Sequence, residues 1–176
     1  HFFTIADHVN LPCIVYNVPS RTGVTIQPET YLALSKHPGI AGAKEASGNF
    51  SAIAQTMMLC GDELPIYSGN DDQIIPILSL GGKGVISVLS NVAPKETHDI
   101  VALFLEGKIK ESRELQLKAL PLVHALFSEV NPIPVKAALN LMGKEVGPLR
   151  LPLTEMEAAH QEVLVEEMKK FGIKLA

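Results

Sequence analysis

Ile40-Ala-Gly-Ala-Lys-Glu-Ala-Ser-Gly48 is a short apolar segment in which a lysine and a glutamate follow four residues typical of a buried strand. Lysine is rarely buried without a partner or a chemical task. A desolvated amine loses its proton more readily and can then attack a carbonyl carbon, which is the first step of Schiff-base formation. The alternative for Lys44 is a stem that packs on apolar surface while the head reaches water.

The residues around this segment repeat one pattern, in which an apolar run precedes a helical run. We expect strands at residues 12–18, 40–46, 65–68 and 84–90. We expect helices between and after them at residues 27–37, 50–59, 72–80 and 94–106. Apolar strands without polar alternation, separated by helices, predict four βα units whose parallel sheet is covered on both faces.

The pattern changes after residue 108, where only helices are expected, at residues 109–127, 134–142 and 154–171. Thr154 has the side chain of a helix N-cap, and Glu157 three residues later completes a capping box. We therefore predict two domains, a βα domain over residues 1–107 and a helical domain over residues 108–176.

Four βα units form either an open sheet or half of an eight-stranded (β/α)8 barrel, and the ends of the strands favour the barrel. Polar residues stand where the expected strands end, and the chemistry of barrels gathers at the carboxyl ends of their strands. Tyr16 and Lys44 hold comparable places on consecutive strands. Because neighbouring strands lie about 4.8 Å apart, these two side chains are expected to meet above the sheet.

Composition excludes several classes of function. The chain has 176 residues, is 47% hydrophobic and carries a net charge of −4 without a basic cluster, so no nucleic-acid surface is expected. No apolar run approaches the roughly 18 residues of a membrane span. Cys13, Cys60 and the six histidines lack metal-ligand spacing, which predicts no metal site and a reducing, cytoplasmic location. His1–Asn10 has neither an initiator methionine nor a signal sequence, and we expect the chain to begin inside a larger protein.

Several motifs together resemble the dihydrodipicolinate synthase family, and the resemblance continues to Leu149-Arg-Leu-Pro-Leu153. They are Tyr16-Asn-Val-Pro-Ser-Arg-Thr-Gly23, Lys44-Glu-Ala-Ser-Gly48, Ser68-Gly-Asn-Asp71, Gly84-Val-Ile-Ser-Val88 and Asn131-Pro-Ile-Pro-Val-Lys136. The resemblance implies an α/β chain that is the C-terminal half of a (β/α)8 barrel, followed by a helical extension. It also implies a lyase that condenses pyruvate with L-aspartate 4-semialdehyde in lysine and diaminopimelate biosynthesis, without a cofactor or metal and usually as a homotetramer.

The resemblance assigns catalytic roles to two residues. Lys44 corresponds to the lysine that forms a Schiff base with the pyruvate ketone, and its protonated imine would act as the electron sink for enamine formation. Tyr16 corresponds to the tyrosine that relays protons at that centre, because a phenol can both donate and accept. On position alone, Tyr16 could equally be a core aromatic residue whose hydroxyl is satisfied.

Four further residues correspond to substrate-binding positions. Arg21 matches an arginine that receives the carboxylate of the second substrate, for which a guanidinium fork is well suited. Gly69 and Asn70 are expected to bring backbone close to the substrate or to form a plain turn. Ile86 matches a position whose carbonyl faces pyruvate, or it belongs to the barrel core.

The resemblance also predicts what this chain lacks. The family's front half carries a Gly-Thr-Thr-Gly-Glu loop and a second relay tyrosine, so an N-terminal half-barrel in the same or another chain is the expected partner. The isolated piece is expected to be inactive. Two other functions remain open at this point, a pyruvate lyase of the N-acetylneuraminate lyase type and a non-catalytic fragment. The Ser20-Arg-Thr-Gly23 segment favours the synthase over the lyase.

Overall fold

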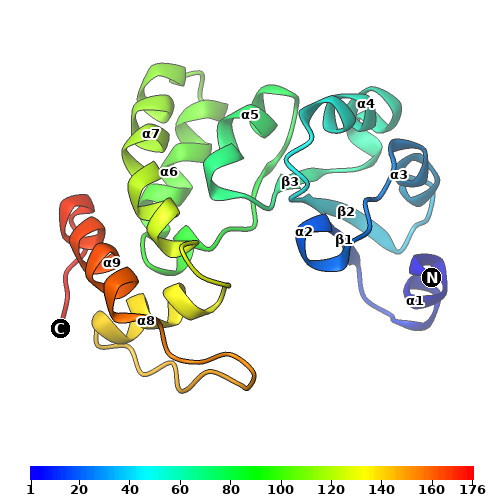
Figure 1. The fold of residues 1–176 in the computed structure, drawn as a ribbon. Coiled ribbons are helices and arrows are strands. Elements are labelled where there is room, and N and C mark those ends of the chain that lie inside the picture. Colours follow the sequence, from blue (N-terminus) through cyan, green and yellow to red (C-terminus); the bar gives the residue numbers. More distant parts are fainter. The chain divides into compact units, whose positions relative to one another are not determined.

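The structure is a computed structural model that describes all 176 residues as two compact units, His1–Ile86 and Ser87–Ala176. The first unit contains a four-stranded parallel sheet in the order β1-β2-β3-β4. Figure 1 labels β1, β2 and β3 of this sheet. Its strands are β1 (Cys13–Asn17), β2 (Ile40–Glu45), β3 (Ile66–Ser68) and β4 (Gly84–Val85). Each strand is therefore hydrogen-bonded to the next one along the chain, and the predicted βα alternation is confirmed.

Seven short helices connect or precede these strands. They are α1 (Phe2–His8), α2 (Pro19–Thr22), α3 (Pro28–Ser35), α4 (Phe50–Cys60), η1 (Gly61–Glu63), η2 (Asp71–Gln73) and α5 (Ile74–Ser79). Pro28 stands in the first turn of α3, where its missing N–H costs nothing. The Asn49 side chain caps α4 by accepting a hydrogen bond from Ala52 N at 3.1 Å. Figure 1 shows α3 and α4 side by side next to the sheet.

The helices of this unit cover one face of the sheet, so the prediction that both faces are covered is wrong. Val15 and Ile66 are buried on that face together with Leu34 of α3. On the opposite face, Ile14 and Tyr16 are 49% and 43% exposed. A segment of a closed barrel has this one-sided cover because its other face turns toward the barrel axis, whereas a doubly wound open sheet carries helices on both faces.

The fourth strand is shorter than the predicted range of residues 84–90. It ends at Val85, and the helix η3 (Leu89–Asn91) follows. Ser90 N donates to Ser87 Oγ at 2.9 Å, and Ser90 Oγ donates to Ser87 O at 3.2 Å. Serine side chains that bond nearby backbone groups in this way offer the chain an alternative to a sheet ladder.

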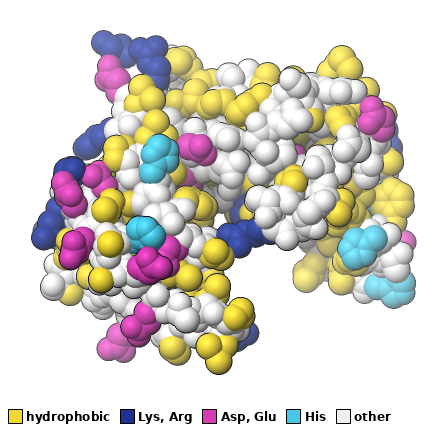
Figure 2. Space-filling view, in the orientation of Figure 1, with side chains coloured by type: hydrophobic (Ala, Val, Ile, Leu, Met, Phe, Trp, Pro, Cys, Tyr) yellow, Lys and Arg dark blue, Asp and Glu magenta, His cyan; other side chains and the backbone are white.

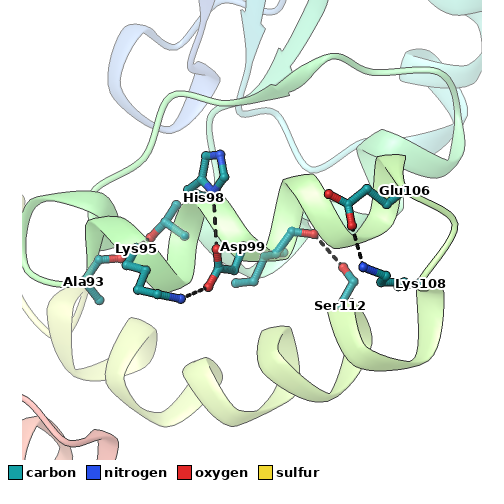
Figure 3. Close-up of polar contacts among 9 residues, drawn as sticks. Ala93, Lys95, His98, Asp99, Glu106, Lys108 and Ser112 are labelled. Atoms are coloured by element: carbon teal, nitrogen blue, oxygen red, sulfur yellow. Dashed lines mark hydrogen bonds and ion pairs between the residues drawn. The ribbon is translucent and has the colours of Figure 1, made fainter.

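The second unit is helical and contains α6 (Pro94–Leu105), α7 (Ile109–Leu126), α8 (Ile133–Leu141) and α9 (Ala158–Phe171). Its core is formed by side chains such as Leu122, Leu126, Leu164 and Met168. Figure 3 shows the link between α6 and α7, in which the buried Ser112 Oγ donates to the backbone carbonyl of residue 100 at 2.6 Å. Figure 2 shows most of the visible charged side chains over this unit.

The two compact units meet at residues 86 and 87, whereas the predicted domains meet at residues 107 and 108. The difference arises because α6 packs against α7 and η3 and therefore groups with the helical unit. Where the barrel half ends along the sequence stays a prediction. None of the helices combines the length and apolar character needed to cross a membrane.

The prediction that the last helix begins at Thr154 is wrong, because α9 begins at Ala158 with Glu157 as its N-cap and no side-chain cap bond. Residues 154–156 belong to no helix or strand. Met156 is buried in the core of the unit, and Glu157 N donates to Glu129 Oε1 at 2.9 Å. These two contacts outweigh the capping box that the sequence offers.

Candidate active site

Lys44 and Tyr16 meet on the open face of the sheet. They are register partners on β2 and β1, and Lys44 Nζ lies 4.2 Å from the centroid of the Tyr16 ring. Lys44 is half-buried, Tyr16 is 43% exposed, and no carboxylate lies within ion-pair distance of the amine. The arrangement places a nucleophilic nitrogen beside a phenol at the carboxyl end of two parallel strands.

Gly69 follows β3 and packs directly against the Lys44 side chain. A Cβ atom at residue 69 would lie 2.7 Å from Ala46 Cβ and 3.2 Å from Lys44 Cε. Gly69 N also donates to Glu45 O at 2.7 Å, which extends the ladder between β2 and β3 past the end of β3. Glycine at this position therefore leaves the space through which the lysine side chain runs.

Asn70 and Ile86 are placed by bonds to residue 68. Asn70 N donates to Ser68 Oγ at 3.2 Å, and Ser68 Oγ donates to Asn70 O at 2.7 Å, so these groups form a tight turn. Ile86 N donates to Ser68 O at 2.9 Å, and the Ile86 side chain is 37% exposed. Both residues lie at the carboxyl end of the sheet, which for Ile86 differs from the expectation of a strand over residues 84–90, and their substrate contacts stay predictions.

Arg21 lies on α2, a single helical turn that the sequence reading did not anticipate. The turn begins two residues after β1 with Pro19 and ends at Gly23, whose φ of 69° falls in the left-handed region that favours glycine. The Arg21 side chain is exposed, at the same end of the sheet as Tyr16. Its role as a carboxylate receptor stays a prediction.

The sequence reading missed a buried polar cluster on the helix-covered face. Glu45 accepts hydrogen bonds from Asn17 Nδ2, at 2.9 Å, and from Tyr31 OH, at 3.0 Å. Burial and the neighbouring Glu45 carboxylate raise the pKa of Tyr31 well above its ordinary value, so the phenol stays a donor. One signal for this cluster was present in the sequence. Asn17 directly follows Tyr16 and Glu45 directly follows Lys44, in each case at the end of an apolar strand.

Comparison with known proteins places this chain in a family. Residues 1–171 match the model of the dihydrodipicolinate synthetase family. The protein named 4-hydroxy-tetrahydrodipicolinate synthase of Lachnoclostridium phytofermentans is 59% identical over 174 residues, which are 98% of this chain and 59% of that protein. The protein of the same name from Caldicellulosiruptor bescii is 58% identical over 175 residues, again 59% of its length.

Solved structures agree with the sequence relatives. The dihydrodipicolinate synthase of Aquifex aeolicus is 40% identical, with a TM-score of 0.94 over 99% of this chain and 60% of that one. The Thermotoga maritima enzyme is 43% identical, with a TM-score of 0.93 over 98% of this chain and 60% of that one. The chain therefore spans about three fifths of the length of the relatives it matches.

Proposed function

Because the chain belongs to the dihydrodipicolinate synthetase family, we propose that the protein condenses pyruvate with L-aspartate 4-semialdehyde through a Schiff base on Lys44. The chain is a partial (β/α)8 barrel followed by helices. The observation that carries the proposal is the contact of Lys44 Nζ with the Tyr16 ring, at 4.2 Å from the ring centroid. A condensation of this kind needs an amine nucleophile and a proton relay side by side.

In the proposed reaction, the neutral amine of Lys44 adds to the keto carbon of pyruvate, and loss of water gives a protonated imine. The imine draws electrons from the adjacent methyl carbon, which loses a proton to become an enamine. The enamine carbon then forms the new bond to the aldehyde carbon of the second substrate, whose oxygen takes up a proton as the imine forms again. Attack of the second substrate's amino group on the imine carbon releases the Lys44 amine and frees the product. Tyr16 donates protons to the reacting groups and accepts protons from them during these steps, because a phenol can do both.

Arg21 is the proposed receptor for the carboxylate of aspartate semialdehyde. Its exposed side chain lies on α2, at the edge of the sheet where Tyr16 stands. A guanidinium can bind a carboxylate through two parallel hydrogen bonds, which would orient the aldehyde toward the enamine. Gly69, Asn70 and the Ile86 carbonyl are proposed to line the pyruvate side of the site.

The remaining part of the proposal concerns what completes the barrel. The open face of the sheet, with Ile14 and Tyr16 exposed, is proposed to face the barrel axis and to be closed by an N-terminal half-barrel in the same or another chain. The complete enzyme is proposed to be a cytoplasmic homotetramer in lysine biosynthesis. Residues 1–176 alone are proposed to be inactive, since the relay would lack its partners.

A direct test follows the condensation in the full-length protein. Lys44→Ala is expected to abolish turnover of pyruvate with aspartate semialdehyde, whereas Lys83→Ala removes an exposed lysine that pairs with Asp62 and is expected to leave turnover unchanged. Sialic acid is the second substrate to try. Cleavage of sialic acid without any condensation would replace the synthase proposal with the lyase.

A further inference from the structure

Asn17, Tyr31 and Glu45 form a polar cluster that is almost completely buried on the helix-covered face of the sheet. Their exposed fractions are 1%, 2% and 5%. A carboxylate in such a place is unfavourable unless its oxygens accept hydrogen bonds. An apolar residue at position 45 would have filled the same space without needing hydrogen-bond donors. The presence of a buried carboxylate there therefore suggests a function.

The Glu45 carboxylate accepts hydrogen bonds through both of its oxygens. Oε1 accepts from Ser47 N at 2.7 Å and from Asn17 Nδ2 at 3.2 Å. Oε2 accepts from Asn17 Nδ2 at 2.9 Å and from Tyr31 OH at 3.0 Å. Asn17 Oδ1 in turn accepts from Ile26 N at 3.1 Å. The cluster thus joins β1 and β2 to α3 and to the segment that leads into it.

The cluster lies one residue beyond the reactive pair on both strands. Tyr16 is the register partner of Lys44, and Asn17 is the register partner of Glu45. Successive side chains of a strand point to opposite faces, so the two pairs stand on opposite sides of the same strand ends. The backbone ladder between the strands closes with Ala46 N donating to Asn17 O at 2.9 Å. The side-chain bond therefore ties the strands where their pairing stops.

We propose that Glu45 and Asn17 are positioning residues, whose hydrogen bond behind the sheet holds Lys44 and Tyr16 at the separation that their chemistry needs. This inference rests on the proposed function. Neither residue touches the substrate, because both face the helices. Small displacements of reacting groups are costly, and a shift of about 1 Å can lower a rate about 100-fold.

Glu45→Gln tests this proposal in the full-length protein, because it keeps the volume and, in either orientation of the new amide, places its NH₂ against the Asn17 Nδ2 donor, which bonds both oxygens of Glu45. The double variant Asn17→Asp, Glu45→Gln reverses the polarity of the bond, so that residue 45 donates and residue 17 accepts. Tyr31→Phe removes one donor and leaves the Asn17 bond in place. Ile66→Val is the matched control, because Ile66 is a buried core residue on β3 that takes no part in the cluster.

The readouts are kcat, the rate at which borohydride traps pyruvate on Lys44, and the melting temperature. Glu45→Gln is expected to lower kcat and the trapping rate at least tenfold, and the double variant to return both to within about threefold of wild type. Tyr31→Phe and Ile66→Val are expected to stay within about threefold, whatever their melting temperatures. Should Glu45→Gln fail to fold, recovery of both folding and wild-type kcat in the double variant still supports the proposal.

The proposal is overturned if Glu45→Gln traps pyruvate at the wild-type rate, or if the double variant regains the wild-type melting temperature while kcat stays at the level of the single variant. Failure of the proposed function looks different, since the wild-type protein itself would then form no adduct on Lys44.

Discussion

Tyr16 and Lys44 face each other across β1 and β2, with the lysine Nζ over the face of the phenol ring at 4.2 Å from its centroid. The pair is a product of register, because parallel pairing places residues 16 and 44 opposite each other and strand alternation sends both side chains to the open face. The helices of the first unit cover the opposite face, so Tyr16 remains 43% exposed.

Removing the Tyr16 hydroxyl separates the proposed role of the hydroxyl in proton transfer from the contact of the ring with Lys44. Tyr16→Phe keeps the ring beside Lys44 but removes the proton donor and acceptor, so we expect kcat to fall about 10²–10⁴-fold. The change lies on an exposed side chain and should alter the free energy of unfolding by less than about 0.5 kcal/mol. Tyr67→Phe is the control, because Tyr67 is the register partner of Lys44 on β3, the strand on the other side of β2 from Tyr16. Equal losses in the two variants would contradict the relay role.

Arg21 is proposed to contact only the second of the two substrates, so its removal should affect them differently. Arg21→Ala should lower kcat/KM for aspartate semialdehyde about 100-fold while leaving the trapping of pyruvate on Lys44 unchanged, because loss of a charge-assisted bidentate contact costs a few kcal/mol. Arg113→Ala, an exposed arginine on α7, serves as the control. Undiminished turnover of aspartate semialdehyde by Arg21→Ala would remove the carboxylate role and reopen the lyase alternative.

Gly69 tests the packing around the reactive lysine. Gly69→Ala places a Cβ atom 2.7 Å from Ala46 Cβ, and we expect overpacking to lower the free energy of unfolding by about 1–3 kcal/mol and to slow adduct formation. Ala46→Gly removes the atom that clashes, so the double variant should recover a good part of both losses. Urea unfolding and the trapping rate measure the two effects. No recovery would contradict the Ala46 clash as the cause and leave the two 3.2 Å contacts of the added Cβ, with Glu45 O and with Lys44 Cε.

The buried Tyr31 hydroxyl makes stability depend on alkaline pH. Burial, and then the Glu45 carboxylate, raise the pKa of Tyr31 above its ordinary value of 10.0. Below that value both the folded and the unfolded chain hold the proton, and the contribution is fully present. Above pH 10 only the unfolded chain releases it, so the free energy of unfolding should fall by up to about 1.4 kcal/mol per pH unit.

Urea unfolding between pH 8 and pH 11 measures this dependence. Tyr31→Phe has no proton to lose at this position, so its free energy of unfolding should decline less steeply above pH 10 than that of the wild type. Parallel declines in the two proteins would show that the Tyr31 hydroxyl is not protected in the folded state.

Much of the fold could be predicted from the sequence because the signals were local. The apolar strands, Pro28 at the start of α3 and Gly107 after α6 mark element boundaries by backbone chemistry alone. The face that the helices cover could not be predicted in this way, since a continuous apolar strand looks the same in a barrel and in a doubly wound sheet. The start of α9 was missed because contacts made by Met156 and Glu157 with the rest of the unit override the local capping signal.

The candidate site likewise contains residues that local sequence signals identify and contacts that only the fold creates. Lys44 and Tyr16 could be singled out because a reactive residue type interrupts an apolar strand. The acceptor role of Glu45 could not be predicted, because its donors come from residues 17, 31 and 47, which only the fold brings together. The placement of Gly69 against the lysine stem likewise depends on the pairing of β2 with β3.

Reductive trapping tests directly whether Lys44 forms the proposed covalent imine with pyruvate. The full-length protein, treated with pyruvate and borohydride and then digested, should yield a peptide whose mass increase equals one reduced pyruvate adduct, located on Lys44. Samples that lack pyruvate or carry Lys44→Arg should yield none. Absence of the adduct from active protein, or its appearance on another lysine, would contradict the assignment of the imine to Lys44.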